Sequence, residues 1–314
     1  MTRHSINLIL LTALCMLLLA FPVLSQTENF SRLPITREAW KKPFPAYRVV
    51  GNLYYVGGYD LASFMITTDK GHILVNTGVY DSVDGIKKSV ESLGFSFSDV
   101  KVLLSMQAHW DHVAGFAEIK RMTGAKLFAH RADAPVLESG GVHQFFNSDP
   151  LKFSKRFGGA VFEPVKVDRR LKHGSTIRLG NTKIKLHHHG GHTKGASTFT
   201  FTTRDKGKKY KVAIVNMGSV NTSRGVKLTG MRLFPNIAKT YRRTFKRQNR
   251  LKFDIWVSSH ASHFNMHDKV KPSDKYDPKR FVDPQGYRVK IELYEKRFLD
   301  TWQKEKTNLI SRDD

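Results

Sequence analysis

The chain has 314 residues, of which 40% are hydrophobic and 25% are charged. This length and composition suffice for one large domain with a packed core. They exclude a small fold that depends on disulfides, because Cys15 is the only cysteine. Lys and Arg outnumber Asp and Glu by 52 to 27, so the formal net charge is +25. A field of this sign attracts anions, nucleic acids and acidic membrane surfaces.

The basic residues are scattered along the chain, and no nucleic-acid recognition motif accompanies them. Their densest group, 241–247, has the pattern of one polar face of a helix. We therefore expect a solvated basic surface that attracts anionic substrates in a general way, and no specific binding of nucleic acid.

The N-terminal residues 1–25 have the pattern of a secretory signal: a positive start, an apolar run from Ile6 to Phe21, and small residues before Ser25. An uncleaved membrane anchor is the alternative. A span needs roughly 20 apolar residues, however, and Pro22 ends this run early. We expect cleavage after Ser25, which removes the only cysteine. The mature chain, 26–314, is then expected to be one periplasmic domain without a membrane span.

The first half of the mature chain alternates between strand and helix patterns. After an extended, proline-containing arm (26–46), the sequence predicts strands at 47–56, 63–68, 72–75, 101–105 and 125–129, and helices at 81–93, 113–122 and 131–137. Residues 139–160, rich in Gly, Asn and Phe, indicate a long surface segment that either covers a site or is an ordinary packed connection.

The second half repeats this arrangement. Strands are predicted at 175–179, 182–188, 196–203, 210–216 and 253–257, with helices at 236–250 and from Pro284 to about Lys306. No linker rich in Pro, Gly or Ser divides the chain, and no short repeat or low-complexity tract is visible. The order of the elements favours one domain with two sheets and helices outside them.

The segment 107–112 (Gln-Ala-His-Trp-Asp-His) follows a short apolar strand and precedes a helix. Imidazole nitrogens and carboxylate oxygens suit a borderline cation such as Zn²⁺. A loop at a strand end can direct alternate side chains toward different ions. Two more histidines also follow strands: His192 in a glycine-flanked turn and His260 after the strand 253–257. Three strand ends of this kind can meet at one edge of a two-sheet fold.

This series of residues resembles the metallo-β-lactamase superfamily. The pattern Gln107-x-His109-x-Asp111-His112, followed by Gly191-His192-Thr193 and then His260, is similar to subclass B3 and, within it, to GOB-type enzymes, in which Gln replaces the first His ligand. The segments 258–264 and 234–237 also resemble that group, and the likeness covers most of 40–305. Other subclasses use a Cys ligand, which the mature chain lacks.

The resemblance implies an α+β fold, an αββα sandwich, with one or two Zn²⁺ ions. Gln107, His109 and His192 would hold one ion, and Asp111, His112 and His260 the other. A carboxamide oxygen is a weaker donor to zinc than an imidazole. We therefore expect the site of Asp111, His112 and His260 to bind zinc more tightly.

Other residues are candidates for supporting or substrate-binding roles. Asn76 and His263 could support a ligand by hydrogen bonding, Asn76 being otherwise a plain turn residue, and Ser219 and Met217 lie in the region that meets the substrate in the resembling family. Trp40 and the pair Phe145-Phe146 could form apolar walls of a site, or simply pack. The remaining histidines lack partners in the sequence and are expected to be structural or solvated.

The expected reaction is zinc-dependent hydrolysis of the β-lactam amide of penicillins, cephalosporins or carbapenems by a hydroxide formed on the metal, in a monomer. Bound zinc lowers the pKa of water toward about 7, and Asp111, besides being a ligand, could orient the attacking water. The fold alone does not select the substrate. A lactonase or thioesterase of the same fold, and a non-catalytic protein that binds metal or polyanions, stay open as alternatives.

Overall fold

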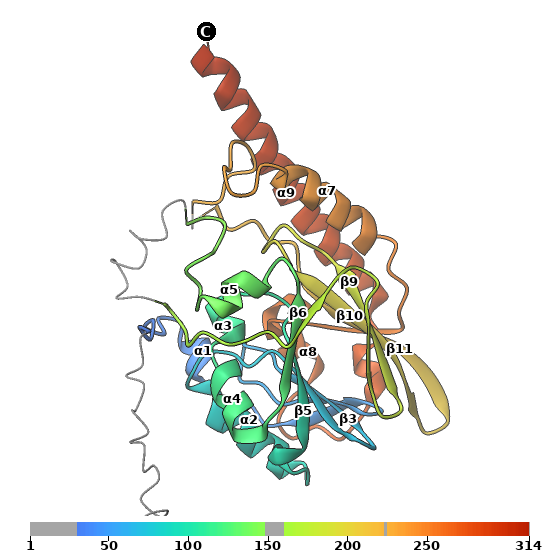
Figure 1. The fold of residues 1–314 in the computed structure, drawn as a ribbon. Coiled ribbons are helices and arrows are strands. Elements are labelled where there is room, and N and C mark those ends of the chain that lie inside the picture. Colours follow the sequence, from blue (N-terminus) through green and yellow to red (C-terminus); the bar gives the residue numbers. More distant parts are fainter. Residues whose placement is uncertain (1–29, 148–159, 223–224, 314) are drawn as a thin grey trace, which may run out of the picture.

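Two β-sheets face each other in the computed structural model, and helices cover their outer sides (Figure 1). The structure describes residues 30–147, 160–222 and 225–313. The proposed signal segment therefore lies outside the described residues, as does most of the predicted surface segment 139–160.

The first sheet has seven strands in sequential order. They are β1 (Tyr47–Val50), β2 (Leu53–Tyr55), β3 (Phe64–Thr68), β4 (Gly71–Val75), β5 (Val100–Leu104), β6 (Lys126–His130) and β7 (Arg169–Leu171). Strands β1 to β4 are antiparallel, and β4 to β7 are parallel. The carboxyl ends of β4, β5 and β6 therefore lie at the same edge of the sheet.

The second sheet has five strands in the order β12-β11-β10-β9-β8. They are β8 (Thr176–Leu179), β9 (Thr182–His188), β10 (Ser197–Asp205), β11 (Lys208–Val215) and β12 (Ile255–Ser258). Only the β11–β12 pair is parallel in this sheet; the other pairs are antiparallel.

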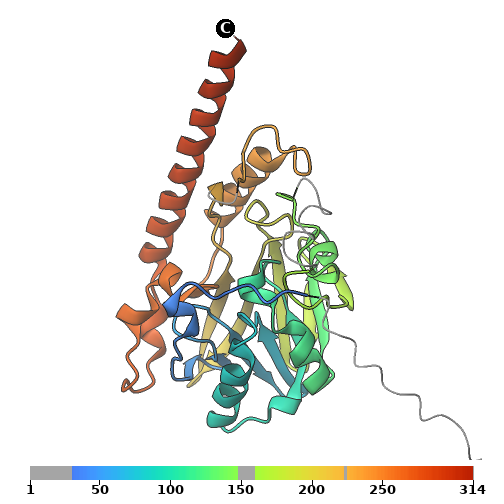
Figure 2. The same cartoon turned by 90° about the vertical axis from the view of Figure 1, so that its left-hand side faces the viewer.

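The helices are α1 (Glu38–Lys41), α2 (Ser82–Ser92), α3 (Trp110–Val113), α4 (Phe116–Thr123), α5 (Ala134–Glu138), α7 (Ile237–Gln248), α8 (Met266–Lys269) and α9 (Pro284–Asp313). Short 3₁₀ turns occur at Phe97–Asp99, Ala261–Phe264 and Pro278–Phe281. Figure 2 shows α9 lying along one side of the molecule, with its C-terminal end projecting beyond the rest of the fold.

Successive side chains of the central strands point to opposite faces of the sheet, and this alternation separates the inner core from the outer, helix-covered core. On β4, Ile73 and Val75 face the core between the sheets, whereas Leu74 faces the outer cluster that contains the apolar residues of α2 and α4. On the other side, Tyr241 and Phe245 of α7 join the core of the second sheet. The αββα sandwich and its α+β class are thus confirmed.

Several predicted boundaries differ from the structure. The run 47–56 forms two antiparallel strands, because Gly51 has a φ of +54° and turns the chain back after β1. Helix α1 interrupts the predicted extended arm, β7 was not predicted, and the last helix continues to Asp313. No helix among the described residues is long and apolar enough to cross a membrane.

A group of histidines lies along β9 and its neighbours. His130 of β6 stacks on His188 with ring centroids 4.2 Å apart. His187 and His189 contact the hydroxyls of Thr200 and Thr198 at 2.7 and 2.8 Å. Burial lowers the pKa of His130 to about 3, assisted by the charge of His188. Burial, with His173 and Lys185, lowers the pKa of His187 to about 4, and burial places the pKa of His189 well below 6.5.

These depressed pKa values predict an acid-labile fold. Below about pH 6.5 the unfolded chain binds protons that the folded chain does not, so stability is complete above that pH and is lost as the pH falls toward 4 and then 3. Each such group contributes a slope of about 1.4 kcal/mol per pH unit. Urea unfolding of metal-free protein between pH 7.5 and 5 should show this loss. His187→Gln should reduce the slope, and the exposed His143→Gln should leave it unchanged; equal slopes for all three proteins would contradict the assignment.

Candidate metal centre

The predicted ligands follow three strands at one edge of the sandwich. The segment 107–112 follows β5, His192 lies in the turn between β9 and β10, and His260 is the second residue after β12. These side chains lie on short loops at this edge. Because each loop begins at the end of a buried strand, the sheets fix the positions of the side chains.

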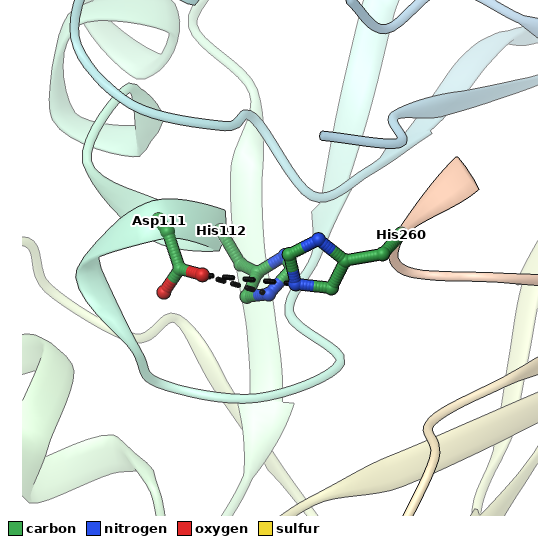
Figure 3. Close-up of side chains that lie close together, drawn as sticks. All are labelled: Asp111, His112 and His260. Atoms are coloured by element: carbon green, nitrogen blue, oxygen red, sulfur yellow. Dashed lines mark ion pairs between the residues drawn. The ribbon is translucent and has the colours of Figure 1, made fainter. Parts of the chain in front are cut away.

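Asp111, His112 and His260 form one cluster, and one ligand atom of each lies within 4.8 Å of the others. Asp111 Oδ2 is 3.4 Å from His112 Nε2 and 3.7 Å from His260 Nε2. Figure 3 shows the carboxylate and both rings directed toward one another from α3 and from the end of β12. This combination of one carboxylate and two imidazoles is typical of a zinc site.

His109 and His192 form a second cluster beside the first. His109 Nδ1 lies 3.1 Å from His192 Nε2. The other ring nitrogen of His192, Nδ1, lies 2.9 Å from the backbone oxygen of Ser219 and 3.0 Å from its hydroxyl. A bond from Nδ1–H to Ser219 leaves the Nε2 lone pair facing His109. Gln107 lines the same cavity.

One cavity of about 240 Å³ joins the two clusters. Its lining includes Gln107, His109, Asp111, His192 and His260, while His112, which is only 1% exposed, contacts Asp111 and is not itself part of the lining. The structure thus brings together all six residues that the sequence singled out as ligands.

Buried polar atoms at this cavity fit a bound cation. Gln107 Oε1 and both ring nitrogens of His112 are buried without a hydrogen-bond partner among the described residues. Burying such atoms unpaired is costly. Burial also lowers the pKa of His112 to about 3, so this ring is neutral at pH 7 and its lone pair is available. An oxygen and an imidazole of this kind are donors that Zn²⁺ accepts.

Asp60, which the sequence reasoning missed, orients His260. Its Oδ2 lies 3.0 Å from His260 Nδ1 and accepts a bond of 3.2 Å from Trp40 Nε1, while its Oδ1 accepts bonds from the backbone and hydroxyl of Ser262. Burial alone would raise the pKa of Asp60, but the hydrogen bonds and charge of His260 outweigh it and lower this pKa below its usual range. An ionised carboxylate on Nδ1–H leaves the Nε2 lone pair for a metal.

Asp133, also missed, joins the two ligand loops. It is buried, and it accepts bonds from the backbone of Ala108 at 3.1 Å, the hydroxyl of Thr193 at 2.6 Å and the backbone of Gly195 at 2.6 Å. Burial raises its pKa to about 6, although these three donors oppose the rise. Asp133 therefore bonds to both the segment 107–112 and the His192 turn, in addition to the backbone bond of 2.8 Å from Ser197 to Met106.

The candidates for supporting roles differ in position. Asn76 has a φ of +59°, and its side-chain oxygen accepts a bond of 3.1 Å from the backbone of Met106, so it contacts the ligand segment through the backbone. His263 lines the cavity, and its ring centroid is 4.8 Å from that of His260. Support of a ligand by either residue stays a prediction.

Both candidates for substrate contact, Ser219 and Met217, line the cavity, as does Trp40. The two phenylalanines differ: Phe145 is 3% exposed and belongs to the core, whereas the ring of Phe146 is 6.1 Å from that of His109. Phe145 therefore packs in the interior, and Phe146 lies close to the site.

Removal of the Asp60 charge should weaken zinc binding at His260. Asp60→Asn keeps the shape but loses the carboxylate that orients the ring, and loss of such a partner typically lowers metal affinity about 10- to 100-fold. Competition with a chromophoric chelator measures the change. Asp268→Asn, the same substitution at an exposed position outside the cavity, should bind zinc as the unmodified protein does. Unchanged affinity in Asp60→Asn would contradict the role of Asp60.

Comparison with known proteins agrees with this geometry. The model of the metallo-beta-lactamase superfamily matches residues 57–205. The solved structure of the metallo-beta-lactamase GOB-18 from Elizabethkingia meningoseptica is 41% identical, with a TM-score of 0.82, and the match covers 88% of this chain and 98% of that one.

Two further solved structures support the same conclusion. The class B3 di-zinc metallo-beta-lactamase LRA-12 from an Alaskan soil metagenome is 41% identical, with a TM-score of 0.80 over 87% of this chain and 99% of that one. FEZ-1 from Legionella gormanii is 37% identical, with a TM-score of 0.78 over 85% and 98% of the two chains. The chain therefore belongs to the metallo-β-lactamase superfamily and, within it, to the class B3 metallo-β-lactamases.

Proposed function

We propose that this protein is a zinc-dependent hydrolase that opens the β-lactam ring of penicillins, cephalosporins or carbapenems. The observation that carries the proposal is the pair of ligand clusters at one cavity, built from Gln107, His109 and His192 and from Asp111, His112 and His260. The similarity to class B3 enzymes, one of them described as a di-zinc enzyme, supports both the metal and the reaction.

Zinc bound here would lower the pKa of a coordinated water toward about 7 and would polarise the carbonyl of the substrate. The protein contributes position and charge. The carboxylate of Asp111 lines the cavity that the two clusters share, where it could accept a hydrogen bond from the attacking water and direct it at the carbonyl carbon. His260 is held by Asp60 and His192 by Ser219, so both rings keep a fixed tautomer and orientation.

The hydrolysis adds one water across the amide. Its oxygen bonds to the carbonyl carbon, the C–N bond breaks, and a proton from the water ends on the ring nitrogen. No covalent intermediate with the protein is needed, because a water supplies the nucleophile. The buried side chain of Met217 and the indole of Trp40 form apolar parts of the wall, which limits access of bulk water to the reacting groups.

The two clusters should differ in affinity. Asp111 brings a negative charge to its cluster, whereas Gln107 offers a neutral carboxamide oxygen. Stepwise addition of zinc, or of cobalt as a spectroscopic substitute, to metal-free protein should therefore fill the site of Asp111, His112 and His260 first. Gln107→His should raise the affinity of the other site. Filling of the Gln107 site first would overturn both the ranking and the physical reason given for it.

Hydrolysis itself is tested with a chromogenic cephalosporin and a carbapenem. We expect turnover by the zinc-loaded protein, loss after chelation, recovery after zinc is restored, and a fall of about 10³-fold or more in His260→Ala, since one ligand of the tighter site is removed. His143→Ala, at an exposed position outside the cavity, is the matched control. Failure of fully loaded protein to open any β-lactam, or faster turnover of an acyl-homoserine lactone, would reject this substrate class.

We also propose that residues 1–25 direct export to the periplasm, and that 26–314 act there as a single-domain monomer without specific binding of nucleic acid. The apolar run from Ile6 to Phe21 and the small residues before Ser25 support the export. Fractionation of cells that express the full chain, with N-terminal sequencing of the product, tests the compartment and the cleavage point.

A further inference from the structure

The cavity has a single guanidinium at its wall. Among the described residues that line it, Arg37 is the only Lys or Arg. This is unexpected in a chain with 52 basic residues, because nearly all of that charge lies elsewhere. Penicillins, cephalosporins and carbapenems carry a carboxylate on the fused ring system, so a cation at the wall of this cavity has an obvious chemical counterpart. The inference below rests on the proposed function.

Arg37 is held in place by an aromatic contact. It immediately precedes α1, and its guanidinium lies over the indole of Trp40, 4.8 Å from the ring centroid. Trp40 is itself fixed, since its Nε1 donates to Asp60 and its ring lies 5.8 Å from that of Trp110 and 6.1 Å from that of His260. The contact places the positive charge on the side of the cavity that carries the His260 ligand.

No acidic side chain neutralises Arg37 within the described part of the chain. Its neighbour Glu38 forms an ion pair with Lys41 at 2.8 Å. The carboxylate of Asp60, which also lines the cavity, accepts hydrogen bonds from Trp40 and Ser262 and pairs with His260. Arg37 forms no ion pair with any described carboxylate and is exposed to solvent. Its five N–H donors are therefore open to a ligand.

The other candidates for this contact are less suitable. The hydroxyl of Ser219 lies 3.0 Å from His192 Nδ1 and has a single O–H to donate, so it can give a carboxylate one neutral hydrogen bond and no charge. Met217 has no polar hydrogen to donate. A guanidinium binds a carboxylate through two parallel N–H···O bonds while its face stays on an aromatic ring. We propose that Arg37, positioned by Trp40, binds the carboxylate of the substrate, and that the segment before β1 is consequently part of the substrate site.

The experiment compares Arg37→Gln with the unmodified protein on two forms of one substrate: a cephalosporin with its free carboxylate and its methyl ester. Loss of a charge-assisted pair should lower kcat/KM for the free acid about 10- to 100-fold, mainly through KM. The ester has no negative charge to bind, so both proteins should hydrolyse it at similar rates. Arg37→Lys should recover part of the activity, because lysine keeps the positive charge but cannot form two parallel N–H···O bonds to the carboxylate.

Two controls separate this effect from loss of fold, metal or total charge. Zinc content and unfolding midpoint should be the same in Arg37→Gln as in the unmodified protein. Arg178→Gln removes one charge from an exposed position on β8 and should not change kcat/KM. Equal losses on acid and ester, or no loss on the acid, would overturn the role of Arg37 and leave the proposed function standing. An unmodified, zinc-loaded protein that opens neither substrate would overturn both.

Discussion

The hydrogen bonds of Asp133 are the interaction on which the rest of the site depends. The segment 107–112 belongs to the first sheet and the His192 turn to the second, and β-sheet hydrogen bonding connects neither to the other. Asp133 bonds to both, through Ala108 and through Thr193 and Gly195. Its carboxylate is fully buried, and such burial is tolerated only because donors from the two loops surround it. Together with the backbone bond from Ser197 to Met106, these bonds hold the loop of His109 beside the loop of His192.

Asp60 fixes the part of the cavity wall that contains His260 and Trp40 in a similar way. Asp60 lies after β2, and it contacts His260 from β12 and Trp40 from α1. A partly buried carboxylate here links segments that belong to different sheets, through the imidazole that it orients. The centre therefore has two kinds of residue: those that carry the donor atoms, and the acidic residues Asp60 and Asp133, which bond to the segments that carry those donors and fix them. These acidic residues give the ligands a fixed geometry before any metal or substrate arrives, so less ordering is required on binding.

The sequence predicted the donor residues and missed the carboxylates that fix them, for a physical reason. The donors follow strands, and a strand end followed by Gln-x-His-x-Asp-His is visible as a local pattern, as are the glycines beside His192. Asp60 and His260 are 200 residues apart, and Asp133 and Thr193 are 60 apart, so no local spacing connects them. The order of the elements correctly predicted two sheets with helices outside them. The division of 47–56 into two strands escaped prediction because it depends on the conformation of one residue, Gly51. Gln107 lines the cavity as expected, but its role as a ligand stays a prediction.

The scattered surface charge and the fixed charge of Arg37 act differently on an approaching anion. A net charge of +25 spread over the surface acts on an approaching anion only within about 8 Å at physiological ionic strength, because salt screens it beyond that distance. Such a field raises the frequency of encounter but selects no orientation. Orientation requires a charge at contact distance on a rigid support, which here is Arg37 on Trp40. High salt should therefore slow capture of substrate through the scattered charges while it affects the fixed contact less. The effect of the scattered surface Lys and Arg on substrate capture can therefore be separated from the effect of Arg37 by a change of salt concentration.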